Sequence, residues 1–260
     1  MVALAATLHD PEGRLLPVLV AHCARFRDYA GVVVAATAET DVRVVARLRE
    51  HDVMVLPGER RIGVARRSAV AAALAVGQSA VIYCDFDRWL HWSNHFPDEL
   101  AAIDGRISHR RPRPWYVCLG RTARAFATHP EPQRMAEGAT NRALSLLVGR
   151  RLDATAGACW LSREGAEVIV RESVESTNAT DLEWPALIHR TNPRRLGFLA
   201  NQGLEFETAT FYPNEIAAAG GRAAWIHAHY DRPEVWQTRL RLATDSVAAA
   251  CRVLGNPGEA

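Results

Sequence analysis

Short apolar runs alternate with longer amphipathic stretches along the first third of the chain. The apolar runs are bounded by glycine, proline or charged residues, which is typical of buried strands. The longer stretches repeat their apolar residues at helical spacing and lie next to helix-breaking residues. This pattern predicts strands at 2–8, 31–36, 53–56 and 80–84, and helices at 15–29, 42–50 and 63–76, the last ended by Gly77.

This alternation indicates an α/β fold with a mostly parallel sheet and helices on both faces. The second half of the chain is less regular, but it still predicts further strands and a long closing helix. We expect a single domain over 1–260, with a first half at 1–104, a smaller second half at 105–231 and the closing helix at 232–260. In the second half we predict strands at 115–119, 158–161, 196–200 and 204–209, and helices at 132–148, 182–189 and 233–253.

Two carboxylates follow the fourth predicted strand, Asp85 and Asp87, with Phe86 between them. In an extended strand, residues i and i+2 point to the same side, so we expect both carboxylates to project together from the strand end. Adjacent carboxylates repel each other unless a cation lies beside them. Hard oxygen ligands suit Mg²⁺ or Mn²⁺, and these ions suit a diphosphate. The motif therefore predicts an enzyme that handles a nucleoside diphosphate.

Composition excludes several other classes of protein. The chain contains no lysine, so all 31 of its Lys and Arg residues are arginine. A P-loop and Schiff-base or pyridoxal-phosphate chemistry both need a lysine and are excluded. A net charge of +2 does not favour nucleic acid as the main partner. The five cysteines are scattered, which indicates reduced thiols and a cytoplasmic location, and no apolar run is long enough for a transmembrane segment.

Three blocks, in this order, resemble the GT-A glycosyltransferases, especially the family-two-like enzymes that use nucleotide-diphospho-sugars. They are the glycine and small-residue helix at 63–69 leading to the D-x-D strand, the acceptor-side strand at 157–163, and the acidic helix start at 180–184. The resemblance implies a GT-A, Rossmann-like fold and a metal-dependent transfer of sugar to an acceptor hydroxyl. The implied partners are a nucleoside-diphosphate sugar and a small-molecule or glycan acceptor, with Mg²⁺ or Mn²⁺ as cofactor. A homo-oligomer is compatible with the sequence.

The same resemblance implies roles for individual residues. Most belong to the first half, which would bind the nucleotide sugar. Each also has a purely structural interpretation: the carboxylates could cap helices, the arginines could be solvated, and the tryptophans could belong to the core. The implied set is His9, Asp10, Thr37, Gly63, Arg66, Arg67, Asp85 and Phe86 for the nucleotide sugar, Asp87, His227 and His229 for the metal, Asp181 or Glu183 as catalytic base, and Trp160 and Trp184 for the acceptor.

Two departures from the family pattern bear on the mechanism. Thr37-Ala38-Glu39 replaces the usual acidic tripeptide after the second strand, and Thr180-Asp181 keeps only the second of two carboxylates. Asp181 acting as base predicts inversion, whereas a distant Asp181 would favour retention. One alternative function is a sugar-nucleotide nucleotidylyltransferase, although its lysine-containing signature is absent. Another is a non-catalytic nucleotide-sugar-binding or scaffold protein with the same fold.

Overall fold

The sheet of the computed structural model, which describes residues 2–76 and 79–255, has seven strands in the order β3-β2-β1-β4-β6-β5-β7. All pairs are parallel except the two made by β6, which runs antiparallel to both of its neighbours. The predicted α/β fold with a mostly parallel sheet is confirmed. The strands are β1 Ala3–Leu8, β2 Val32–Thr37, β3 Met54–Gly58, β4 Ala80–Cys84, β5 Tyr116–Arg121, β6 Ala158–Ser162 and β7 Leu196–Asn201.

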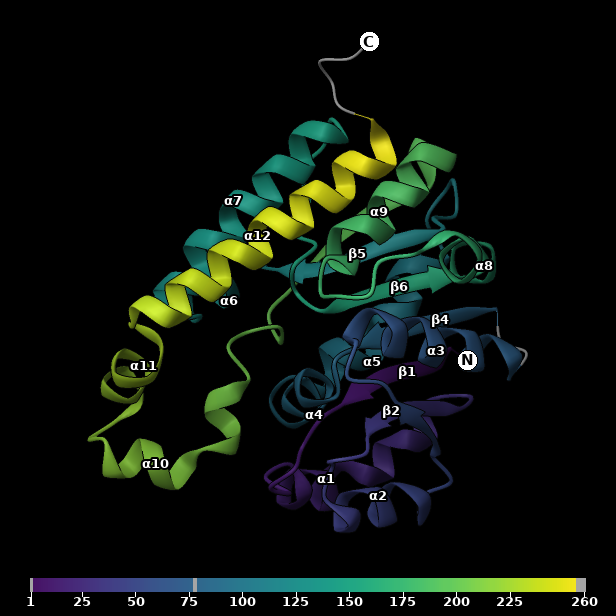
Figure 1. Ribbon diagram of the computed structural model, residues 1–260. Helices are drawn as coiled ribbons and strands as arrows, with labels where there is room; N and C mark the ends of the chain where they lie inside the picture. Colours follow the sequence, from purple (N-terminus) through teal and green to yellow (C-terminus); the bar gives the residue numbers. More distant parts are fainter. Residues whose placement is uncertain (1, 77–78, 256–260) are drawn as a thin grey trace.

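Helices cover both faces of this sheet (Figure 1). In Figure 1, α7 and α12 run side by side above β5, while α1 and α2 lie at the bottom beyond β2. The α-helices are α1 Leu16–His22, α2 Val42–Arg49, α3 Ile62–Ala75, α4 Phe86–His95, α5 Pro97–Ser108, α6 Ala123–Ala127, α7 Glu131–Leu147, α8 Arg163–Glu172, α9 Thr180–Thr191, α10 Pro213–Ala218, α11 Arg222–Tyr230 and α12 Pro233–Leu254. Single 3₁₀ turns occupy Cys23–Asp28, Pro193–Arg195 and Thr208–Phe211.

Each central strand contributes to two hydrophobic cores, one on either face. Leu4 and Ala6 of β1 belong to the core beneath α1, α2, α4 and α5. Ala3 and Ala5 of the same strand belong to the core beneath α3, α8 and α9. Burial on both faces explains why these strands are apolar throughout rather than alternating. None of the described helices is both long and apolar enough to span a membrane.

The structure differs from the sequence-based elements in several places, and the helices α6, α8, α10 and α11 of the second half were not predicted. The predicted helix 15–29 is split into α1 and a 3₁₀ turn at Cys23–Asp28. The predicted strand 204–209 is wrong, because this segment pairs with no strand and the Phe206 amide instead donates to the Thr128 hydroxyl at 2.8 Å. The helices α4 and α5 follow directly after β4, where no helix was predicted. The predicted helix stop at Gly77 lies outside the described residues.

Two helical glycines give a matched test of the packing between α8 and the sheet. A Cβ on Gly165 would lie 2.0 Å from the Trp115 carbonyl oxygen, whereas a Cβ on Gly105 in α5 would meet nothing within 4 Å. We expect Gly165→Ala to lower the free energy of unfolding by about 2 kcal/mol or more through overpacking. Gly105→Ala should raise it by up to about 1 kcal/mol through helix propensity. Urea unfolding of both variants measures this, and equal effects would contradict the close contact.

Candidate functional site

The chain turns from strand to helix at the D-x-D motif. Asp85 directly follows β4 and is the N-cap residue of α4, so Asp87 lies in the first turn of that helix. The expectation that both carboxylates project from extended backbone is therefore wrong, because the helix begins at Phe86. The two carboxylates still interact electrostatically, since Asp85 is among the causes that raise the pKa of Asp87.

A buried arginine from α3 holds Asp85 and the candidate base together. Arg66 has a side chain only 4% exposed, and its guanidinium pairs with Asp85 at 3.1 Å and with Asp181 at 2.5 Å. Its Nε donates to the Tyr83 hydroxyl at 3.0 Å, and Nη1 also donates to the Thr180 hydroxyl at 3.0 Å. Burial opposes the charge on this guanidinium, but the two carboxylates outweigh it and raise its pKa. Arg66 thus links β4 to α9 across the cleft.

Tyr83 and Thr7 also form hydrogen bonds with Asp85. The Tyr83 hydroxyl donates to Asp85 Oδ1 at 2.5 Å, and the Thr7 hydroxyl, from β1, donates to the same oxygen at 3.3 Å. Gly157, just before β6, has a φ of 62°, and a Cβ there would lie 2.4 Å from Asp85 Oδ2. Only glycine allows the second half of the chain to approach this carboxylate so closely.

Asp181 lies in the first turn of α9 and faces a cavity of about 140 Å³. Burial raises the pKa of its carboxyl to about 6, against the opposing effect of Arg66. A carboxyl with this pKa is mostly ionised at neutral pH and still has appreciable affinity for a proton, as a general base requires. Asp85, Arg88, Glu137 and Arg239 also line this cavity.

Asp87 and Glu207 form a second acidic group near Asp85. Burial raises the pKa of the Asp87 carboxyl to about 7, and the nearby Glu207 and Asp85 carboxylates add to the rise. Glu207 is 6% exposed, and its Oε2 has no hydrogen-bond partner among the described residues. The guanidinium of Arg88 lies 3.9 Å from Asp85 and 3.5 Å from Glu207, and its own Nη1 is likewise unpartnered. These buried groups have unused hydrogen-bonding capacity, which suits a site that gains a polar ligand.

Two of the residues implied for nucleotide binding meet at the ends of β1 and β2. The exposed His9 ring places Nδ1 2.8 Å from the Thr37 hydroxyl. Asp10 instead points into the protein, where its two oxygens accept the amides of Arg14 and Leu15, each at 2.9 Å. Asp10 therefore caps the turn before α1 and is buried, so the structure gives it a structural role.

Three more residues of the implied nucleotide site serve the protein interior. A Cβ on Gly63 would lie 2.5 Å from the Glu175 carbonyl oxygen, so Gly63 packs against the loop before α9. Arg67 donates to that carbonyl and to the Ser173 hydroxyl, and therefore does not reach the cleft. Phe86 is fully buried and stacks with Trp89. The structure therefore gives these three residues structural contacts in place of the implied nucleotide contacts.

The alternative base and both implied acceptor residues are buried structural groups. The Glu183 carboxylate accepts from the Ser173 hydroxyl at 2.5 Å and from the amides of Val174 and Glu175. Trp160 is fully buried and donates to Asp104, so it lies in the core rather than in an acceptor pocket. Trp184 is 2% exposed and its indole N–H donates to Ser173 at 3.1 Å. No acceptor can reach these side chains.

The two late histidines do not form a pair. His227 and His229 lie on α11, not in an extended segment, so side chains two positions apart diverge. His227 is within 3.2 Å of Asp231, and the His229 ring lies 2.8 Å from the Trp225 carbonyl oxygen. Among the described residues, no three His, Cys, Asp or Glu side chains form a ready metal site. The implied histidine ligands are therefore not supported by this geometry.

Sequence reasoning missed Arg88 and Glu207, which the structure places beside the D-x-D motif. Arg88 directly follows that motif, so its position in the chain was a usable signal. No sequence pattern indicated Glu207. Its segment was predicted to be a strand at 204–209, whereas it is irregular in the structure and brings Glu207 near Asp87.

Solved structures of glucosyl-3-phosphoglycerate synthase from Mycobacterium tuberculosis share this architecture. One, in complex with UDP, matches 100% of this chain and 82% of its own, at 13% identity and a TM-score of 0.57. Another, with Mn²⁺, UDP and phosphoglyceric acid, matches 100% and 80%, at 12% identity and 0.57. A third, with Mn²⁺, UDP-glucose and glycerol 3-phosphate, matches 100% and 82%, at 13% identity and 0.56.

This chain has the GT-A fold. No protein-family model matches its sequence, and no curated protein does. In an open GT-A sheet, ligands bind beyond the carboxyl ends of the parallel strands, where His9, Thr37 and Asp85 lie in this chain.

The raised pKa of Asp87 predicts a pH-dependent stability. Because folding raises this pKa from 3.8 to about 7, the folded state binds the proton more tightly. The resulting stabilisation is present at low pH and is lost as the pH rises through about 7. We expect Asp87→Asn to gain about 2 kcal/mol of unfolding free energy, relative to wild type, between pH 5 and pH 8.

Urea unfolding at the two pH values measures this gain. Asp98→Asn, an exposed aspartate in the first turn of α5, controls for the loss of a charge at a helix start. An Asp87→Asn effect that is equal at both pH values would contradict the buried, proton-binding carboxyl.

Proposed function

We propose that this protein is a glycosyltransferase that moves a sugar from a nucleoside-diphosphate sugar to an acceptor hydroxyl. The observation that carries the proposal is the bridge made by Arg66, which brings Asp85 and Asp181 to one cavity from segments 96 positions apart (181 − 85). Titratable groups with perturbed pKa values in a cleft are typical of catalytic sites. The shared GT-A fold, found in an enzyme whose structures hold UDP and UDP-glucose, supports the same function.

The donor would lie across the ends of β1, β2 and β4. The exposed His9 and the half-buried Thr37 are the polar groups at the first two ends, and Asp85 lies at the third. The cavity at Asp181 is too small for a whole nucleotide sugar and would hold only the reacting end of the donor and the acceptor hydroxyl. The nucleotide itself would then occupy the open surface beside His9.

The residues at the D-x-D motif fit a divalent cation. Mg²⁺ and Mn²⁺ bind through one or two carboxylates together with substrate phosphate oxygens and water, so a complete protein cage is not needed. Asp87 and Glu207 would hold the ion, since Asp87 is a half-buried carboxylate, Glu207 is a buried one, and Glu207 Oε2 lacks a partner among the described residues. When bound, the cation would neutralise the charge that develops on the leaving diphosphate.

Asp181 would act as the general base. Its carboxylate would take the proton of the acceptor hydroxyl while the acceptor oxygen bonds to the anomeric carbon and the bond to the diphosphate breaks. Arg66 would hold this carboxylate in place and keep it ionised at neutral pH. Attack from the side opposite the diphosphate would invert the anomeric configuration. The broader assignment to sugar transfer does not depend on this stereochemistry.

Replacing the base tests the proposal directly. With Mn²⁺ and a panel of UDP-, GDP- and TDP-sugars, we expect Asp181→Asn to lower kcat by about 10²-fold to 10⁴-fold, because the proton acceptor is lost. Binding of the nucleoside diphosphate should stay within about threefold, since charge is removed only at the acceptor side. In the wild type, kcat should rise with pH through about 6 as Asp181 ionises.

Nucleotide release assays and calorimetry measure these quantities. Asp245→Asn, on the exposed face of α12, is the matched control and should leave both unchanged. Wild-type turnover in Asp181→Asn would refute the assignment of the base. Nucleotide binding without turnover of any donor in the wild type would instead favour a binding protein.

Glu207 provides an independent test of the cation site. We expect Glu207→Gln to weaken Mn²⁺-dependent UDP binding by about tenfold, because one of two carboxylates would lose its charge. The neighbouring Glu205→Gln removes a carboxylate that pairs with Arg124 and is the matched control. Calorimetry with and without Mn²⁺ separates the two variants, and an unchanged Mn²⁺ effect in Glu207→Gln would remove Glu207 from the site.

A further inference from the structure

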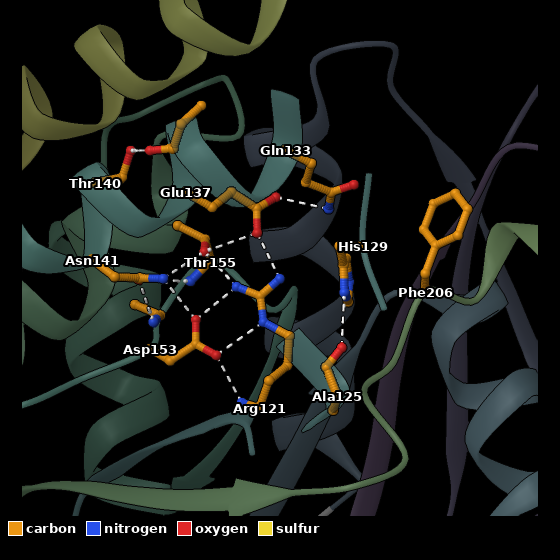
Figure 2. A network of polar contacts seen from close by, with 12 residues as sticks. Arg121, Ala125, His129, Gln133, Glu137, Thr140, Asn141, Asp153, Thr155 and Phe206 are labelled. Carbon is orange, nitrogen blue, oxygen red and sulfur yellow. Dashed lines mark hydrogen bonds and ion pairs between the residues drawn. The ribbon is translucent and has the colours of Figure 1, made fainter. Parts of the chain in front are cut away.

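A larger cavity, about 780 Å³, lies beside α6 and α7 and shares no lining residue with the cavity at Asp181. A network of buried polar contacts around Arg121 lies between the two (Figure 2). Arg121, Asn141 and Asp153 line the larger cavity, while Glu137 and Thr155 of the same network line the smaller one. The larger cavity is therefore a separate site and not an extension of the candidate active site.

The inner wall of this cavity is held rigidly by that network. The Arg121 side chain is fully buried and donates to Asp153 at 2.9 and 2.7 Å and to Glu137 at 2.6 Å. Asn141 adds a bond to Asp153 at 2.7 Å and accepts the Ala154 amide at 2.8 Å. The charge of Asp153 is thus offset within the wall, as Figure 2 shows. Arg239 also pairs with Glu137 at 3.5 Å, so two arginines balance the two carboxylates of the network.

The rim of the cavity is strongly basic. Arg142 on α7 and Arg151 in the following loop are exposed, and the guanidinium group of neither makes a hydrogen bond or ion pair within residues 2–76 and 79–255. Arg150 also lines the cavity but donates to the Leu196 carbonyl. Four arginines and one aspartate therefore line the space, counting the paired Arg121 and Asp153.

Apolar side chains form the rest of the lining. Phe126, Leu146 and Leu152 contribute carbon surface, and Leu146 is 63% exposed although it is large and apolar. A cavity of this volume is in the range of small-molecule sites, which combine apolar walls with a few polar anchors.

We propose that this cavity binds a small organic phosphate, with the phosphate held by Arg142 and Arg151 and the organic part lying against Phe126 and Leu146. Two guanidinium groups with free donors match the oxygens of a phosphate monoester, to which arginine binds in a bidentate manner. The apolar wall distinguishes such an ester from inorganic phosphate. This site is independent of the proposed sugar transfer, because none of its lining residues belongs to the cavity at Asp181.

Phenyl phosphate and inorganic phosphate are suitable probes, titrated calorimetrically into the full-length protein. We expect phenyl phosphate to bind more tightly than inorganic phosphate by about tenfold, since only the ester reaches the apolar wall. The double variant R142Q/R151Q should weaken phenyl phosphate binding by about tenfold or more through the loss of charge-assisted hydrogen bonds. Both residues are exposed, so this variant should melt at the wild-type temperature.

The matched control is R27Q/R49Q, which removes two exposed arginines far from the cavity and should bind phenyl phosphate as the wild type does. Absence of saturable binding, wild-type affinity in R142Q/R151Q, or equal losses in both double variants would each overturn the proposal. Because the readout is binding alone, failure of sugar transfer would not affect it.

Discussion

The buried guanidinium of Arg66 is the interaction on which the candidate site depends. It ties the end of β4 to the start of α9, two elements that come from different halves of the chain. Removing one partner of a buried ion pair leaves an uncompensated charge, which costs about 3–5 kcal/mol. The site can therefore exist only when both halves are folded around Arg66. In a chain without lysine, the planar guanidinium also has enough donors to serve Asp85, Asp181, Tyr83 and Thr180 at once.

The antiparallel strand β6 brings the second half of the chain close to Asp85. It pairs with β4 over Ala80–Cys84 and brings Gly157 directly to Asp85, whose amide donates to the Gly157 carbonyl at 3.0 Å. A side chain at Gly157 would collide with the carboxylate, so the position is restricted by space and by backbone conformation together. The polar network at Arg121 then supports the opposite side of the same cavity through Glu137 and Thr155.

The sequence predicted the sheet better than the site because apolar runs depend on burial, whereas side-chain contacts depend on tertiary packing. The limits of β4 were predicted correctly, and Asp85, Arg66 and Asp181 do come together. The helix that starts at Phe86 was not predicted, because its buried aromatic residues do not reveal whether the backbone is extended or helical. Trp160 was misassigned since a tryptophan next to a site motif looks the same in sequence whether it faces a ligand or the core.

The charges around the D-x-D motif favour the proposed cation. The cavity at Asp181 is balanced, since three arginines (Arg66, Arg88, Arg239) and three acids (Asp85, Glu137, Asp181) line it. The half-buried Asp87 and the buried Glu207 then add two carboxylates near Arg88, and desolvation together with the charges of Glu207 and Asp85 raises the pKa of Asp87 to about 7, which favours binding of a proton. A cation that binds these carboxylates must compete with that proton, so its affinity should increase with pH. The folded protein thus contains a destabilising excess of negative charge at Asp87 and Glu207, which a bound cation would neutralise.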